Sequence, residues 1–145
     1  LSNSCRYGIR AIIYLAGRRS EEGKTGIKQI GKDLGLPTPF LGKILQQLAK
    51  QKILKSMKGP HGGFSMAMDP QKITLYDIVV AIDGEDTFTD CLMHDGPCRS
   101  VSKNKKSCPV HDDYAKVRSE LISLFRSKTV YDLVVKASNS EIITI

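Results

Sequence analysis

The segment from Leu36 to Leu48 constrains the fold of this chain most strongly, because it combines the signals that start a helix with a regular apolar spacing. Pro37 and Thr38 are typical of a helix start, and Pro39 is tolerated in a first turn, where its missing N–H has no intrahelical partner. The apolar positions that follow have i, i+3, i+4, i+7 spacing: Leu41, Ile44, Leu45 and Leu48. This spacing predicts a helix with one buried face.

The opposite face of this predicted helix carries hydrogen-bond donors and no carboxylate. Its residues are Gly42, Lys43, Gln46, Gln47 and Lys50. Lysine and glutamine side chains can bind phosphates and base edges in a DNA major groove. For this helix alone, an ordinary solvent-exposed face is the simpler interpretation. The neighbouring segments favour a DNA-binding face instead.

A shorter helix is predicted immediately before this segment, over residues 27–34. Its last residue, Leu34, completes an apolar face, and Gly35 stands where a helix ends in the left-handed conformation. Two helices joined by so tight a turn are typical of a helix-turn-helix, with residues 36–48 as its second member.

Two short strand-like runs follow, at residues 53–57 and 64–67, with a loop of turn-forming residues between them. This arrangement predicts a basic β-hairpin, the wing of a winged helix. Glycines in the loop would let the backbone approach DNA closely, while lysine and histidine side chains would donate hydrogen bonds. Together with the second helix, the wing gives the predicted DNA contacts: Thr38, Lys43, Gln46, Gln47, Lys50, Lys55, Lys58, Gly59, His61 and Gly62.

The net charge of +7 is unevenly distributed along the chain. Residues 1–80 contain 13 Lys and Arg against 5 Asp and Glu, whereas residues 81–145 contain 9 against 10. A basic half joined to a nearly neutral half indicates that the first half binds a polyanion. Double-stranded DNA fits better than a membrane surface, because no predicted helix combines a large apolar face with a rim of lysine and arginine.

The chain is expected to be a soluble, cytoplasmic protein. No apolar run approaches the ~20 residues that a membrane span needs, and Arg6 and Arg10 interrupt the first apolar segment, which argues against a secretion signal. Its 145 residues suffice for one domain with a real core, or for one domain with an appendage. The sequence has neither a phosphate-binding P-loop nor a metal-hydrolase helix motif, so an enzyme is not predicted.

Residues 74–84 predict a further helix, opened by a capping-box sequence. Residues 85–107 contain few aliphatic side chains and are predicted to form a long functional loop. Pro109 then marks the start of a long helix, and residues 129–137 predict a last short one. We therefore expect residues 1–84 to form the DNA-binding domain and residues 85–107 the sensor loop. Residues 108–145 would contain the dimerisation helix.

The long helix carries an apolar series with 4, 3, 4, 3 spacing: Val110, Tyr114, Val117, Leu121 and Leu124. This is a heptad seam over about two repeats, which suggests pairing with a second long helix. Packing against its own domain explains the spacing equally well, because two heptads are weak evidence. The predicted fold class is mainly α with a small β-hairpin wing: a winged helix-turn-helix followed by a long C-terminal dimerisation helix.

Four segments in this order resemble the Rrf-type winged-helix regulators, the bacterial family that includes IscR, NsrR and CymR. They are residues 7–16, 36–48, 58–64 and 73–82, and the wing sequence Lys-Gly-Pro-His-Gly-Gly-Phe is the specific one. The resemblance covers nearly the whole chain. It implies a homodimer, joined by the long C-terminal helix, that binds a roughly palindromic DNA operator. In the family the second helix enters the major groove and the wing enters the minor groove.

Three cysteines fall within 18 residues, just before or at the start of the long helix: Cys91, Cys98 and Cys108. His111 lies one helical turn after Cys108, so both side chains can reach a common metal. Soft thiolates together with an imidazole suit an iron–sulfur cluster or zinc. A first helix is predicted over residues 4–19. Cys5 stands alone on it and is interpreted as a small buried hydrophobe.

The resemblance favours the cluster, because iron–sulfur members of the family carry three cysteines in this loop and the IscR branch adds a histidine three residues after the last. It implies a two-iron, two-sulfur cluster held by Cys91, Cys98, Cys108 and His111. The Cys-x6-Cys-x9-Cys spacing is longer than the family's usual gaps. NsrR-like members use an acidic ligand from the first helix, where this chain has Arg6. A Cys3His zinc site would use the same four residues, and His94 is a rival fourth ligand.

Overall fold

The computed structural model describes residues 1–18, 23–93, 96 and 108–139. The predicted ligand Cys98 and the rival fourth ligand His94 lie outside these residues. The described elements, in chain order, are α1 (Asn3–Gly17), α2 (Ile27–Leu34), α3 (Thr38–Lys50), β1 (Leu54–Met57), β2 (Gly63–Met66), the 3-10 turn η1 (Pro70–Lys72), α4 (Leu75–Asp83), α5 (Asp86–Thr89), α6 (His111–Ser127) and α7 (Val130–Ser138). The predicted fold class is therefore confirmed: a mainly helical chain with one two-stranded antiparallel sheet.

The turn between α2 and α3 is as tight as the sequence predicts. Gly35 adopts the left-handed conformation with φ of 63°, and the Leu36 N–H bonds back to the Gly31 carbonyl at 2.8 Å. A Cβ at Gly31 would lie 2.9 Å from the Leu36 oxygen and from the Thr38 methyl carbon. Glycine at position 31 therefore lets the two helices approach each other.

The wing is an antiparallel hairpin in which Leu54 pairs with Met66 and Met57 with Gly63. A third segment, not predicted from the sequence, joins it from the other side. Thr25 exchanges two backbone hydrogen bonds with Phe64, both 2.9 Å long. This bridge fixes the hairpin to the segment that leads into α2.

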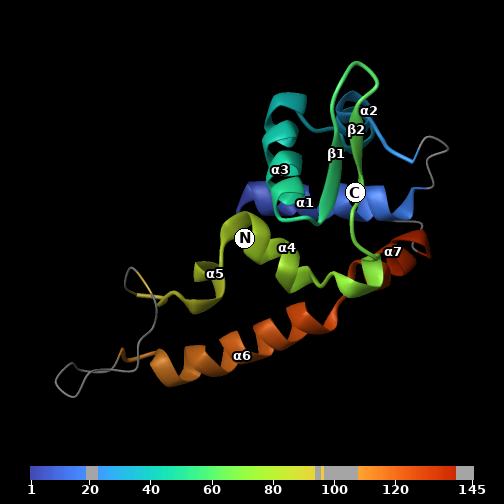
Figure 1. Cartoon of the computed structure of the whole chain (residues 1–145). Coiled ribbons are helices and arrows are strands. Elements are labelled where there is room, and N and C mark those ends of the chain that lie inside the picture. The colour runs from blue at the N-terminus through green and yellow to red at the C-terminus, as the bar shows by residue number, and fades with distance from the viewer. Residues whose placement is uncertain (19–22, 94–95, 97–107, 140–145) are drawn as a thin grey trace.

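The main hydrophobic core lies where α1, α3 and the hairpin meet. All four predicted apolar positions of α3 are buried, together with residues of α1, α2, β1, β2, α4 and α7: Ala11, Ile12, Leu15, Ile30, Leu34, Leu54, Phe64, Ile78 and Val130. In Figure 1, α3 and the hairpin rise above α1 and α4, while α6 runs beneath them. One layer thus carries the helix-turn-helix and wing, and the other carries the long helix.

A second, smaller core joins α1, α4, α5 and α6 through Cys5, Val79, Phe88 and Phe125. Phe88 lies on α5 and stacks on Tyr76, with ring centroids 4.7 Å apart. The prediction that residues 85–107 form a loop is therefore wrong for Asp86–Thr89, which form α5. One aromatic side chain suffices to hold the short helix against the core.

Both capping boxes form as the sequence predicts. Thr74 and Asp77 cap α4, and Thr129 and Asp132 cap α7. The Thr129 N–H donates to the Asp132 carboxylate at 2.9 Å, and this hydrogen bond is the largest cause of the lowered pKa of Asp132. The two capped turns also pair with each other, because Thr74 and Thr129 form an isolated antiparallel bridge. This bridge holds the start of α7 beside the start of α4, and α7 packs on α1. Among the described residues, no helix is long and apolar enough to cross a membrane.

Candidate nucleic-acid interface and cysteine-bearing segment

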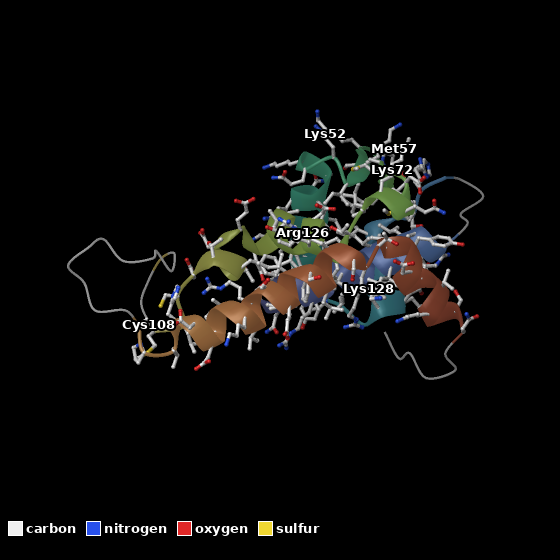
Figure 2. All side chains as sticks on the ribbon, turned by 90° about the horizontal axis from the view of Figure 1, so that it is seen from below. Lys52, Met57, Lys72, Cys108, Arg126 and Lys128 are labelled. Carbon is white, nitrogen blue, oxygen red and sulfur yellow. The ribbon has the colours of Figure 1, made fainter. Side chains whose placement is uncertain are left out.

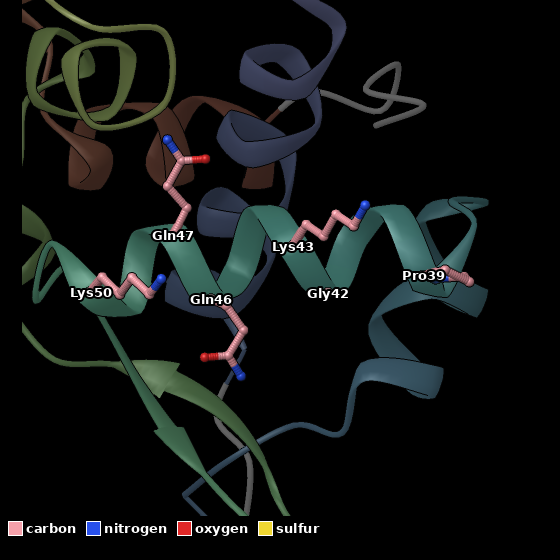
Figure 3. A pocket seen from close by; sticks show the side chains of 6 residues that line it. All are labelled: Pro39, Gly42, Lys43, Gln46, Gln47 and Lys50. Atoms are coloured by element: carbon pink, nitrogen blue, oxygen red, sulfur yellow. The ribbon is translucent and has the colours of Figure 1, made fainter.

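The outer side of α3 carries a basic stripe made of Pro39, Lys43, Gln46 and Lys50. These residues, with Gly42 and Gln47, line a shallow groove along the helix (Figure 3). Lys43, Gln46 and Lys50 are exposed. They share one side because they recur every three or four residues, which is close to the helical repeat. Two cationic side chains and one amide are thus presented together to solvent.

The charge around this stripe is uniformly positive. No aspartate or glutamate occurs between Asp33 and Asp69, whereas five lysines do: Lys43, Lys50, Lys52, Lys55 and Lys58. The Asp33 carboxylate pairs with the Arg18 guanidinium at 2.9 Å. A hydrogen bond from Tyr14, with further ones from Gln29 and Arg18, lowers the pKa of Asp33. Helix α3 and the hairpin therefore contribute no carboxylate that would repel a phosphate.

Gln46 spans the gap between the recognition helix and the wing. Its Nε2 donates to the Ser56 hydroxyl on β1 at 3.3 Å, and its side chain is exposed. A neutral donor–acceptor bond of this length at an exposed position is weak. The amide can therefore exchange this partner for a base edge at little cost.

The exposed side chain of Gln47, also a predicted base contact, has a bonding partner in another helix. Its side chain turns toward α4 (Figure 3), where Nε2 donates to the carbonyl oxygens of Ala81 at 3.0 Å and Ile82 at 3.1 Å. These carbonyls belong to the last turn of α4, where backbone acceptors have no helical partner. Gln47 thus caps a neighbouring helix, although it belongs to the same polar face as Gln46.

Thr38, a further predicted contact, has a packing role, and so does Gly42 beside Lys43. A Cβ at Gly42 would lie 3.1 Å from Ile27 Cδ1, so a larger residue there would displace the end of the Ile27 side chain by a few tenths of an ångström. Thr38 is half-buried, and its methyl group lies next to Gly31. Thr38 therefore helps form the tight turn, and only its remaining exposed surface is available to a ligand.

The wing extends its basic and glycine residues into solvent. Lys55, Lys58, Gly59 and His61 are exposed. Gly59 has φ of 107°, which other residues rarely adopt, and a Cβ at Gly62 would overlap the Met57 carbonyl oxygen. The turn itself therefore requires these two glycines. At Gly59 and Gly62 no side chain keeps a nucleic acid at a distance from the backbone.

The described cysteine ligands lie away from the wing, next to α6. Figure 2 shows Cys108 at the far end of α6, remote from Met57 of the hairpin. Cys108 and His111 are half-buried, and the His111 N–H bonds to the Cys108 carbonyl at 2.9 Å. Cys91 is also half-buried, and its N–H bonds to the Gly96 carbonyl at 2.9 Å.

This donor set is suited to a soft metal, because it combines thiol sulfur with imidazole nitrogen. Within residues 1–18, 23–93, 96 and 108–139, no three His, Cys, Asp or Glu side chains are grouped as a metal site. The predicted third thiol, Cys98, falls outside those ranges. The thiols of Cys91 and Cys108 and the imidazole of His111 are chemically suited to an iron–sulfur cluster or zinc, and Cys98 would be the third thiol.

Sequence reasoning missed Arg118 in the middle of α6. Its Nη2 donates to the carbonyl oxygen of Asp90 at 2.7 Å, directly before Cys91. The only sequence signal was its position four residues after Tyr114, over whose ring the guanidinium lies at 4.7 Å. This contact attaches the Cys91 segment to the long helix.

Cys5 is fully buried in the second core. Burial, with a smaller contribution from the charge of Asp83, raises the pKa of its thiol to about 11. A thiol with so high a pKa stays protonated and is a poor metal ligand and nucleophile. Its interpretation as a small hydrophobe is confirmed.

The predicted seam of α6 is divided between packing and solvent. Val117, Leu121 and Leu124 are 60%, 42% and 50% exposed, whereas Val110 and Tyr114 are half-buried. The inward side of α6 instead uses Phe125 and Ile122. Intrachain packing therefore does not account for the three exposed residues.

A tight helix-turn-helix followed by a basic hairpin defines a winged-helix DNA-binding fold. Residues 1–136 match the family described as Rrf2, iron-dependent transcriptional regulator. A putative HTH-type transcriptional regulator of Aquifex aeolicus (strain VF5) is 34% identical over 133 residues, covering 92% of this chain and 90% of that protein.

Solved structures agree with this assignment. CymR of B. subtilis, described as its global cysteine regulator, superposes with a TM-score of 0.73 at 25% identity, covering 94% of this chain and 96% of CymR. The IscR of T. potens has the same fold, with a TM-score of 0.72 at 23% identity, covering 100% of this chain and 93% of that one. The chain belongs to the Rrf2 family of transcriptional regulators, and these relatives are regulators, not enzymes.

Proposed function

We propose that this transcriptional regulator binds operator DNA as a homodimer and senses iron–sulfur, redox or nitric oxide status through a two-iron, two-sulfur cluster. The proposed ligands are Cys91, Cys98, Cys108 and His111. One observation carries the sensing proposal: His111 is the first residue of α6 and Cys108 lies three residues before it, while Arg118 of the same helix bonds to the segment that contains Cys91. The description of the family as iron-dependent supports it.

When bound, the cluster would supply a centre whose charge and integrity change with the cell's redox and nitric oxide status. The chain's own residues would transmit that change. The Cys91 segment follows α4 and α5, which pack with α6 in the second core through Val79, Phe88 and Phe125. Ordering or releasing this segment would therefore bias the position of α6 relative to the DNA-binding layer.

On the DNA side, α3 would enter the major groove with Lys43 and Gln46 facing bases. Lys50, Lys55 and Lys58 would bind phosphates, and the glycine-rich wing tip would enter the minor groove. The exposed stripe and the absence of carboxylates from residues 34–68 support this assignment. Gln47 is omitted from the base-reading set because its amide caps α4.

The exposed apolar residues of α6, Val117, Leu121 and Leu124, would pair with their counterparts in a second copy. The first 84 residues would then act as the DNA-binding domain and residues 108–145 would contain the dimer contacts. The sensor segment, residues 85–107, would lie between them, with α5 fixed to the core and the cysteines beyond it.

The proposed cluster is tested by anaerobic reconstitution with iron and sulfide, followed by metal and sulfide assay and an absorption spectrum. We expect two irons and two sulfides per chain, and loss of the visible absorbance in Cys91→Ala, Cys98→Ala and Cys108→Ala. Cys5→Ala is the matched control, because its thiol is buried in the core, and it should retain the cluster.

A cluster-free or zinc-binding regulator is the alternative, favoured by the equally close structural similarity to CymR. Uptake of zinc with no iron or sulfide would replace the sensor by a structural Cys3His site. Uptake of neither would leave a regulator controlled by another signal or by a protein partner.

A further inference from the structure

The guanidinium of Arg118 is enclosed between α6 and the segment that leads to Cys91. Its Nη2 donates to the Asp90 carbonyl at 2.7 Å, and the group lies over the Tyr114 ring at 4.7 Å. Its Nε is buried and has no hydrogen-bond partner. A buried donor without a partner costs free energy. The contacts to Asp90 and Tyr114 must therefore offset that cost.

The side of α6 that holds Arg118 is also the side of a proposed ligand. His111, Tyr114 and Arg118 have i, i+3, i+7 spacing, so they lie in one row along the helix. Seven residues of helix separate Arg118 from His111 by about 10 Å along the axis. The guanidinium reaches back over the ring of Tyr114, which lies one turn from His111, so the Asp90 carbonyl is held on the side of α6 that carries this row.

Asp90 is bonded covalently to Cys91, so the position of one restricts the other. Cys91 is held further by its own N–H bond to the Gly96 carbonyl at 2.9 Å. In addition, the Met93 N–H lies 3.5 Å from the Cys91 sulfur. A short turn around Cys91 is thus attached to α6 on the side of Arg118.

We propose that Arg118 is a positioning residue that docks the Cys91 turn onto α6 before any metal binds. The purpose of this docking rests on the proposed function: it would hold one ligand, Cys91, near the start of α6, where Cys108 and His111 lie. A lysine would keep the charge but lose the planar arrangement of donors.

The chain offers a matched control on the same helix. Arg126 also lies over an aromatic ring, that of Tyr76, at 4.5 Å. It is exposed and sits near the other end of α6, far from Cys108 (Figure 2). Arg126→Met therefore removes a cation–π contact and one charge from α6 without touching the Asp90 carbonyl.

The first measurement is amide hydrogen exchange in cluster-free protein. Loss of a charge-assisted hydrogen bond should speed exchange at Cys91 and Met93 by about tenfold in Arg118→Met. Arg126→Met should leave these amides unchanged, and Arg118→Lys should give an intermediate rate. Helical circular dichroism identifies a variant that has unfolded, in which case Arg118→Lys decides the test. Unchanged exchange in a folded Arg118→Met or Arg118→Lys variant would overturn the docking role.

The second measurement is cluster loss from reconstituted protein challenged with a chelator, followed by visible absorbance. We expect loss about tenfold faster in Arg118→Met than in Arg126→Met, because a released ligand segment dissociates more often. Faster exchange with unchanged cluster loss would overturn the ligand-positioning purpose. If wild-type protein takes up no iron, the proposed cluster fails, while exchange in the cluster-free protein still measures the docking role.

Discussion

The side-chain amide of Gln47 donates to the backbone oxygen of Ala81 at 3.0 Å, which ties the recognition helix to the last turn of α4. Helix α1 meets α4 at the same place through two contacts. The Ser2 N–H bonds to the Asp83 carboxylate at 2.8 Å, and a Cβ at Gly8 would overlap the Ile82 side chain. Because α4 leads directly into α5 and the Cys91 segment, this junction connects the reading helix to the proposed sensor.

The adjacent glutamines of α3 give a sharp first prediction. Gln46→Ala should cost roughly 1–3 kcal/mol of affinity on the cognate operator and little on random duplex, because it removes a base contact. Gln47→Ala should instead lower the free energy of unfolding by about 1 kcal/mol, because it removes the α4 cap. Any loss of DNA affinity should be equal on both duplexes. Fluorescence anisotropy and urea denaturation measure the two effects. A cognate-specific loss in Gln47→Ala would restore it as a base reader.

The wing lysine should act through charge alone. Lys58→Ala is expected to weaken binding to every duplex and to lower the slope of log affinity against log salt by about one unit. Lys116, which is exposed on α6 away from the wing, is the matched control, and Lys116→Ala should leave the slope unchanged. Equal slopes for the two variants would contradict a phosphate contact by the wing.

The apolar stripe of α6 should join two copies of the chain. Leu121→Asp introduces an unpaired charge into that contact and is expected to give a monomer at micromolar concentration. Leu121 is 42% exposed, so the substitution should leave the folded monomer intact. Ser123→Asp adds the same charge at an exposed position outside the stripe and should remain dimeric. Sedimentation velocity distinguishes them, and a stable Leu121→Asp dimer would contradict this interface.

The buried Cys5 thiol predicts a dependence on alkaline pH. Its pKa is raised to about 11 in the folded protein from 9.0, mainly by burial. A raised pKa stabilises the folded state fully below pH 9, and this contribution is lost as pH rises toward about 11. We expect unfolding midpoints to fall over this interval, and to fall less in Cys5→Ala.

Native alkylation checks the same residue. At pH 8.5 iodoacetamide should modify the half-exposed Cys108 and spare Cys5, because the buried thiol is both inaccessible and protonated. Peptide mass spectrometry reads the labelling. Rapid modification of Cys5 in folded protein would contradict its place in the second core.

The helix-turn-helix could be predicted from the sequence because its signals are local. The apolar spacing of α3, Gly35 and the capping threonines Thr74 and Thr129 each act within a few residues. Local pattern and tertiary structure agree at these positions, so the bounds of α2 were predicted correctly at residues 27–34.

The details of the site depend on contacts between distant elements. Gln46 and Gln47 are equivalent in a helical pattern, and only the position of α4 distinguishes the amide that bonds to the wing from the amide that caps α4. The pattern likewise could not place Phe88, a lone aromatic residue in a polar segment, in the core with Phe125. Arg118 acts on Asp90 across 28 positions of sequence, for which no local signal exists.

The central claim, that the cysteine-bearing segment controls DNA binding, is tested most directly by one titration. An operator duplex selected from a random library is titrated with reconstituted and with cluster-free wild-type protein, and Cys108→Ala treated in the same two ways is the control. We predict that the dissociation constants of the two wild-type forms differ by about tenfold, within the usual range of allosteric coupling. The two Cys108→Ala preparations should be indistinguishable. Equal affinities for the two wild-type forms would contradict the claim.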